Sequence, residues 1–178
     1  FEAGNVAEWR ELNKMFSVSI RVFMQQIIAS RTGDASYAHA FAEWPRLLAA
    51  IESGQLDMEP ASVIADRWVR QGVLLLNSSF TLSRFQVSID PHQSRGHLPI
   101  WQPFNIAVLQ ALAARRTPLV CVGFGDAAAQ TLGLAGFGSD TAILRPHPAR
   151  GDEFLAMPNP FDACNKKLLE MGGTPIQW

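Results

Sequence analysis

Hydrophobic and polar positions follow two alternating patterns along this chain. Short apolar runs are typical of strands buried on both faces, and segments whose apolar residues recur every three or four positions are typical of helices. The apolar runs predict strands at residues 20–25, 73–77, 118–123 and 141–146. The periodic segments predict helices at residues 6–15, 45–52, 61–71, 101–115, 126–134 and 160–171. Small, polar and glycine-containing stretches predict loops at residues 29–40 and 83–99.

The order of these elements predicts the fold. Strands alternate with helices, which favours an α/β fold with a largely parallel sheet. We therefore expect residues 1–178 to form one domain, a three-layer α/β/α arrangement around a central, mostly parallel four-stranded sheet. In such sheets, chemistry lies at the carboxyl ends of the strands. Three polar side chains follow predicted strands and should converge there, Gln26, Asn77 and His147.

Composition narrows the class of protein. Hydrophobic residues make up 48% of the chain and charged residues 17%, which is ordinary for a globular domain. No apolar stretch approaches the ~20 residues of a membrane span, and no signal peptide is visible, although the sequence starts at Phe1. The two cysteines do not suggest a disulfide framework, so we expect a reducing cytoplasm. We also expect a monomer.

Charge and metal-ligand spacing bear on possible partners. The net charge of −1 argues mildly against nucleic acid, although basic residues gather late in the chain. No spacing of cysteine and histidine suggests a zinc or iron–sulfur site, so we expect no cofactor.

Four strings carry a resemblance to a known family. They are WVRQGVLLLN (68–77), PLVCVGFGDAAAQ (118–130), RPHPA (145–149) and NPFDACNKKLLEMGGTPIQW (159–178). In their order and spacing they resemble the uracil-DNA glycosylases, and the resemblance spans nearly the whole chain. It implies an enzyme that flips a pyrimidine out of DNA and hydrolyses its N-glycosidic bond, leaving an abasic site.

The resemblance also implies roles for individual residues. Asn77 would read the edge of the base through its carboxamide, and His147 would donate a hydrogen bond to the base as negative charge develops on it. Gln26 would lie near the base, and Phe41 would stack on it. Each has a structural alternative: a strand-end cap for Asn77, a surface or structural donor for His147, a buried amide bonded to backbone for Gln26, and core packing for Phe41.

Cationic side chains would hold the DNA backbone. The candidates for phosphate contacts are Arg150, Lys166 and Lys167, with solvated surface charge as the alternative. Asp126 occupies a serine position of the family's phosphate-touching loop, where a carboxylate would repel phosphate.

The family's first motif, GQDPY, is rewritten in this chain. Aligning residues 20–30 with it keeps Gln26 but places Ile27 where the family has its water-positioning aspartate. Asp34 is the nearest acid and would take over as catalytic base; the alternative is an aspartate that only forms a turn after Gly33. Ala29 replaces a tyrosine that guards C5 of the base.

An alanine in place of that tyrosine predicts room for a substituent at C5. The sequence therefore favours a 5-substituted pyrimidine, such as glucosylated 5-hydroxymethylcytosine in phage DNA, and resembles the phage-defence glycosylases at this level. Two alternatives stay open. One is an atypical uracil-DNA glycosylase in base-excision repair, and the other is a catalytically inactive DNA-binding relative.

Overall fold

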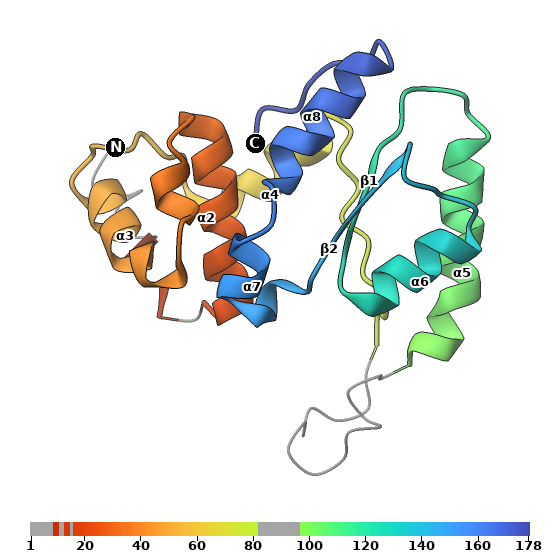
Figure 1. Ribbon diagram of the computed structural model, residues 1–178, viewed down its shortest axis with the longest axis horizontal. Coiled ribbons are helices and arrows are strands. Elements are labelled where there is room, and N and C mark those ends of the chain that lie inside the picture. Colours follow the sequence, from red (N-terminus) through yellow and green to blue (C-terminus); the bar gives the residue numbers. More distant parts are fainter. Residues whose placement is uncertain (1–8, 11–12, 15, 82–96) are drawn as a thin grey trace.

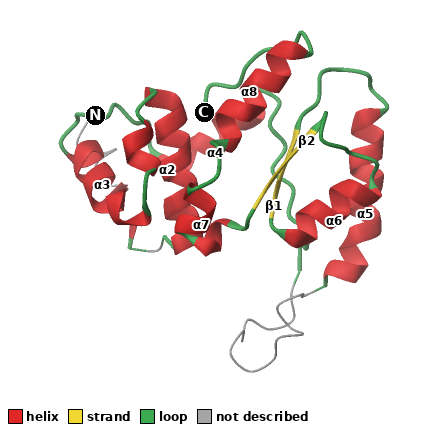
Figure 2. Cartoon of the chain, in the orientation of Figure 1, coloured by secondary structure: helices red, strands yellow, loops and turns green. Residues whose placement is uncertain are grey.

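A computed structural model describes residues 9–10, 13–14, 16–81 and 97–178 of the protein (Figure 1). Most of the helix predicted at 6–15 and most of the loop predicted at 83–99 lie outside the described residues. One side of the molecule is helical, and the other holds the strands with helices beside them (Figure 2). In chain order, the helices and strands are α2 (Val18–Thr32), α3 (Trp44–Glu52), α4 (Ala61–Arg70), α5 (Leu98–Ala113), β1 (Cys121–Phe124), α6 (Asp126–Leu134), β2 (Ala142–Arg145), α7 (Asp152–Leu155) and α8 (Pro160–Glu170). Short 3-10 turns are η1 (Ala35–Ala38), η2 (Phe41–Glu43) and η4 (Pro148–Arg150).

Most of the predicted helices are confirmed. The structure forms α3, α4, α5, α6 and α8 within a few residues of the predicted bounds. Gly72 follows α4 with φ of +92°, a conformation that favours glycine at the end of a helix. The last two predicted strands are confirmed in shortened form as β1 and β2, which pair in parallel from Cys121–Ala142 to Phe124–Arg145.

The strand predicted at 20–25 is wrong, because these residues lie inside the helix α2. The Ser17 hydroxyl accepts a hydrogen bond from the Ile20 N–H and begins the helix, and Gly33, with φ of +72°, ends it. Nearly every residue from Val22 to Ala29 is buried, so no polar stripe marks a helical period. The loop predicted at 29–40 is wrong in its first residues, because α2 continues to Thr32. The 3-10 turn η1 occupies the middle of the predicted loop.

The strand predicted at 73–77 is also absent. This segment has no regular secondary structure, and Leu74 and Leu75 are 56% and 55% exposed. It runs beside β1 (Figure 1), and both line one cavity. Among the described residues, β1 pairs only with β2, so the expected four-stranded sheet is a parallel pair.

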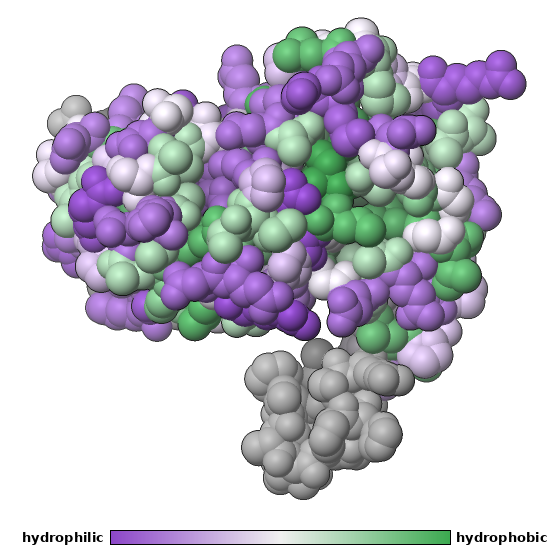
Figure 3. All heavy atoms as spheres, in the orientation of Figure 1, coloured by the Kyte–Doolittle hydropathy of each residue, from purple (hydrophilic) through white to green (hydrophobic). Residues whose placement is uncertain are grey.

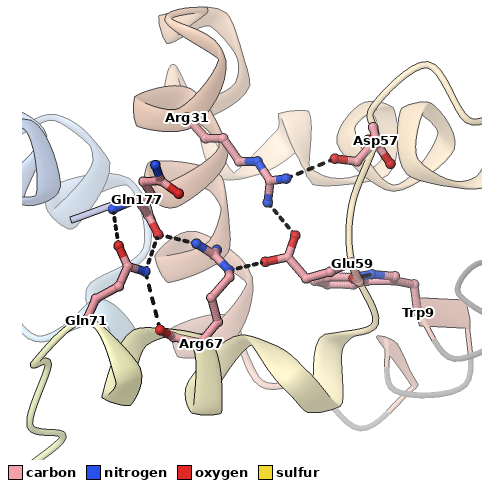
Figure 4. Close-up of polar contacts among 7 residues, drawn as sticks. All are labelled: Trp9, Arg31, Asp57, Glu59, Arg67, Gln71 and Gln177. Carbon is pink, nitrogen blue, oxygen red and sulfur yellow. Dashed lines mark hydrogen bonds and ion pairs between the residues drawn. The ribbon is translucent and has the colours of Figure 1, made fainter.

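The core is concentrated on the helical side. Ile28 and Leu47 are fully buried there, and Trp44 is 3% exposed. The chain between α3 and α4 is fixed by Glu59, whose carboxylate accepts from Arg31 Nη1 at 2.5 Å and from Arg67 Nε at 2.6 Å (Figure 4). Burial raises the pKa of Glu59, but the hydrogen bond from Arg31 and the two positive charges outweigh it and hold the pKa below its ordinary value.

The carboxyl terminus is tied to α4. The backbone carbonyl of Gln177 accepts hydrogen bonds from Arg67 and Gln71, and the Gln177 N–H donates to Gln71 Oε1 at 2.8 Å (Figure 4). Within the described part of the chain, no helix combines the length and apolar character that a membrane crossing requires.

Candidate active site

His147 lies where β2 gives way to a turn. Its Nδ1 accepts a hydrogen bond from the Ala149 N–H at 3.1 Å, and the side chain is exposed. An Nδ1 that accepts an N–H is unprotonated, so the neutral ring carries its proton on Nε2. The turn therefore fixes the tautomer and leaves Nε2–H as a donor toward solvent.

Gly125 explains how His147 is brought close to the end of β1. The Gly125 N–H donates to the Arg145 carbonyl at 2.9 Å, which continues the β1–β2 ladder by one step. A Cβ on Gly125 would lie 3.1 Å from His147 Cβ, and φ at Gly125 is +85°. Glycine is therefore required here both for its backbone conformation and for the close approach of the imidazole.

Asn77 lies at the end of the segment that runs beside β1. Asn105 of α5 donates from Nδ2 to the carbonyls of Asn77, at 3.0 Å, and of Ser78, at 3.1 Å. Asn105 is 1% exposed, so a buried amide holds the backbone that carries the exposed Asn77. Asn105 was not among the residues predicted from the sequence, where its signal is a lone amide within the apolar stretch 104–109.

Gln26 and Ala29 are both interior residues of α2. Gln26 Nε2 donates to the Leu155 carbonyl at 3.4 Å, and the Gln26 carbonyl accepts from Asn159 Nδ2 at 2.7 Å. Ala29 is 7% exposed and packs in a cluster with Ala38, Phe154 and other apolar residues. Because the expected strand is a helix, Ala29 does not stand at a strand end, and neither residue lines the large cavity described below.

Phe41 and Asp34 lie in different places relative to His147. The Phe41 N–H donates to Asp152 Oδ1 at 2.6 Å, so Phe41 lies beside the start of α7, five residues after His147. Asp34 caps η1 instead, accepting from the Ser36 N–H at 2.9 Å, and hydrogen bonds from the side chain and then the backbone of Ser36 lower the pKa of its exposed carboxyl.

The length of α2 separates Asp34 from His147. The turn η4 that follows His147 packs on α2, and a Cβ on the next residue, Gly151, would lie 3.9 Å from Val18. Val18 begins α2, whereas Asp34 follows its end. A 15-residue helix spans ~22 Å at 1.5 Å per residue, so the structure does not bring the two side chains together.

The three side chains expected to contact phosphate, Arg150, Lys166 and Lys167, do not lie together in the structure. Arg150 lies in η4, and its hydrogen bond to Glu153 at 2.7 Å, aided by the charges of Glu153 and Asp126, raises the pKa of the guanidinium. Lys167 instead donates to the carbonyls of Ser139 and Asp140, which precede β2. The lysine therefore lies at the opposite end of the strand from His147.

Lys166 occupies the same helix as Lys167 and is exposed, 4.0 Å from Glu170. Of the three expected cations, Arg150 is thus the one that the structure places at the His147 end of β2.

The cysteines do not form a nucleophilic site. Burial, with the nearby Cys164 adding a smaller effect on Cys121, raises the pKa of both thiols to about 11. Both are free cysteines and stay protonated at neutral pH. The described residues contain no cluster of three or more histidine, cysteine or acidic side chains that could hold a metal ion.

The similar proteins found by comparison with known sequences are named uracil-DNA glycosylase. A Parafrankia protein named uracil-DNA glycosylase is 33% identical over 111 residues, covering 62% of this chain and 47% of the relative. Uracil-DNA glycosylase 1 of Streptomyces coelicolor is 31% identical over 120 residues, covering 67% of this chain and 51% of the relative. The Mycobacterium tuberculosis protein named uracil-DNA glycosylase is 31% identical over 141 residues, covering 76% of this chain and 60% of the relative.

The chain is thus similar in sequence to proteins named uracil-DNA glycosylase, and it spans about half the length of these curated relatives. No protein-family model matches the chain, and no solved structure does. The similarity supports a relationship to the DNA glycosylases.

Proposed function

We propose that this chain is a DNA glycosylase that hydrolyses the N-glycosidic bond of a pyrimidine flipped out of DNA. The observation that carries the proposal is the hydrogen bond from the Ala149 N–H to His147 Nδ1. A backbone N–H donated to Nδ1 leaves the proton on the exposed Nε2, at the carboxyl end of a parallel strand. A neutral imidazole that donates from Nε2 suits a reaction in which negative charge grows on a departing base.

Asn77 supplies the second part of the proposed chemistry. Its carboxamide offers one acceptor and two donors, which match the edge of an extruded pyrimidine. The buried Asn105 holds the backbone of Asn77 by a hydrogen bond to its carbonyl. This contact would reduce the conformational entropy that Asn77 loses when it binds a base. Phe41, beside α7, is the stacking surface in this proposal, and Arg150 is the phosphate contact.

We propose uracil as the base, as in the names of the relatives. The narrower expectation, a bulky 5-substituted pyrimidine such as glucosylated 5-hydroxymethylcytosine, depended on open space beside Ala29 for the substituent at C5. Ala29 lies on α2 in a cluster of buried apolar side chains, which does not favour such a space.

DNA binding without cleavage is the second candidate. It is favoured by Ile27, which stands where the family has its water-positioning aspartate and is 1% exposed in the core. In this candidate Asp34 serves only as the cap of η1. The two candidates differ in whether abasic sites form.

An abasic-site assay tests the proposal. Duplex and single-stranded DNA would carry uracil, thymine, 5-hydroxymethylcytosine or its glucosylated form, and wild type would be compared with His147→Ala and Asn77→Ala. Loss of one preorganised donor costs ~10²–10³ in rate, so each variant should lose that much activity on uracil. His39→Ala removes an exposed histidine in the loop after η1 and should act like wild type.

Two outcomes would contradict the proposal. Equal activity of His147→Ala and wild type would place the chemistry elsewhere. Binding of DNA by wild type with no abasic sites on any substrate would favour the non-catalytic candidate.

A further inference from the structure

Acidic side chains border the carboxyl ends of the two strands on both sides. Asp126 begins α6 directly after β1 and Gly125, and Asp152 and Glu153 begin α7 after β2 and η4. Figure 1 shows α6 and α7 on opposite sides of this end of the strand pair. Hydrophilic residues gather on the visible surface over both helices (Figure 3). The end of the pair that carries His147 is therefore a polar region with several carboxylates.

Two of these carboxylates are engaged within the protein. Asp152 accepts the Phe41 N–H at 2.6 Å, and Glu153 accepts from Arg150 Nη1 at 2.7 Å. Asp126 is exposed, and among the described residues it has no hydrogen-bond or salt-bridge partner. Within the described part of the chain, Asp126 is thus the acid at this end that is available to a bound molecule.

The backbone brings Asp126 close to His147. Asp126 follows Gly125, where an added Cβ would lie 3.1 Å from the Cβ and 3.4 Å from the Cδ2 of His147. The pKa of Arg150 is raised by its hydrogen bond to Glu153, by the charge of Glu153 and, less strongly, by the charge of Asp126. A carboxylate, a neutral imidazole and a guanidinium therefore share one end of the strand pair.

We propose that Asp126 is a further catalytic residue, which holds the attacking water and stabilises positive charge on the deoxyribose. This inference rests on the proposed function and adds the acid that the reaction needs. Ile27 stands in the core where the family has its water-positioning aspartate, and Asp34 follows the end of α2 that is distant from His147. Asp126 supplies a carboxylate from the end of β1 instead.

Hydrolysis balances with this assignment. The bond between C1′ of the sugar and the base nitrogen breaks, and its electron pair leaves on the base, whose negative charge is stabilised by the Nε2–H of His147. The water oxygen bonds to C1′, and the proton that the water loses passes to the Asp126 carboxylate and on to solvent. The base takes up a proton from solvent. A negative charge beside the sugar also attracts the positive charge that develops there.

Substitutions at Asp126 separate catalysis from repulsion of DNA phosphate. Asp126→Asn and Asp126→Ser both remove the charge. A catalytic carboxylate predicts a ~10²–10⁴-fold fall in kcat on uracil-containing DNA, with KM unchanged or lower because less negative charge faces the phosphates. Asp126→Glu should keep part of the activity. Asp140→Asn, at an exposed carboxylate that precedes β2 at the opposite end of the strand, should act like wild type.

A binding measurement tests the same contact without turnover. Two oligonucleotides carry at one position either a pyrrolidine ring, whose protonated nitrogen imitates the cationic sugar, or a neutral tetrahydrofuran ring. Wild type should bind the pyrrolidine oligonucleotide more tightly. Asp126→Asn should reduce this preference on the order of tenfold, because one of the two attracting charges is lost, and Asp140→Asn should leave it unchanged. Circular dichroism shows whether each variant is folded.

The outcomes distinguish this inference from the proposed function. Full activity of both neutral Asp126 variants, or an unchanged preference for pyrrolidine in Asp126→Asn, would overturn the role of Asp126 and leave the glycosylase. A wild type that forms no abasic sites on any substrate would refute the proposed function, and the pyrrolidine preference would still decide whether Asp126 faces the sugar. A wild type that binds neither oligonucleotide would overturn both.

Discussion

The helical side and the strand side of this protein fill their interiors to different degrees. Around α2 and α3, side chains such as Ile28 and Leu47 are completely buried, and a carboxylate shared by two arginines fixes the chain that enters α4. Around β1, an apolar cavity of about 690 Å³ separates the strand from residues 73–78. Two of the strings that resemble the glycosylases contain β1 and the end of β2, whereas Phe161 and Trp178 of the last string belong to the main core.

This difference has a physical meaning for the proposed site. His147 and Asn77 belong to the segments that border the less filled side, and their backbones are held by specific hydrogen bonds rather than by a continuous sheet. The helical side places Phe41 beside the start of α7 and buries Gln26 and Ala29 within α2.

The largest effect is expected from truncating a core side chain, which tests whether the helical side is packed more completely than the strand side. Leu47→Ala on α3 should lower the free energy of unfolding by about 2–5 kcal/mol, because it removes a fully buried side chain from a filled core. Leu75→Ala should cost about 0.5 kcal/mol or less, because that side chain is 55% exposed beside the cavity. Urea denaturation of both variants measures the difference, and equal losses would mean that the two sides are packed alike.

Sequence pattern predicted the elements that have one buried face or clear ends. It found α4, closed by Gly72, and β1 and β2, which are short apolar runs. It failed for α2, where burial on most sides removes the helical period, although Ser17 and Gly33 mark its ends and 15 residues is long for a strand. It failed at 73–77 because an apolar run becomes a strand only if a neighbour supplies hydrogen bonds.

The candidate site was predictable to a similar extent. His147 and Asn77 could be identified from strand-end positions and motif context, but their fixing groups could not. The Ala149 N–H and the Asn105 amide act through the folded chain, and Asn105 is 28 residues from Asn77. Gln26 and Ala29 were expected near the base because the alignment of residues 20–30 with the family's first motif placed them at the end of a strand, and these residues form a helix instead.

A smaller effect is expected from the ion-pair centre of the helical side. Glu59→Gln weakens two charged hydrogen bonds, at about 1.5–3 kcal/mol for such bonds, and should lower stability by an amount in or below that range. Glu170→Gln removes an exposed partner 4.0 Å from Lys166 and should cost about 0.5 kcal/mol or less. Similar losses in the two variants would contradict a fixing role for Glu59.

The pH dependence of the same group has a defined sign. The folded-state pKa of Glu59 lies below its unfolded value, so its stabilising contribution is present above the unfolded pKa and is lost as pH falls through the folded pKa. Wild type should therefore lose its advantage over Glu59→Gln on acidification. An advantage that grows at low pH would show that the sign is wrong.

The smallest expected change is in the substrate preference of an Ala29 variant, which separates packing from substrate choice. Ala29→Tyr places a large ring in a helix position that is 7% exposed and surrounded by Ala38 and Phe154. Overpacking should lower the free energy of unfolding by about 1–3 kcal/mol, measured by urea denaturation. The ratio of activities on uracil and on glucosylated 5-hydroxymethylcytosine should stay unchanged, measured below the unfolding transition, because the ring does not enter a base pocket.

Ala42→Tyr, at an exposed position of η2, is the control for added aromatic volume and should leave stability nearly unaltered. If Ala29→Tyr instead abolished activity on the 5-substituted base and spared both uracil cleavage and stability, Ala29 would face C5 of the base. The helical side would then contribute directly to base selection, and the division between a packed support and a reactive strand side would fail at this residue.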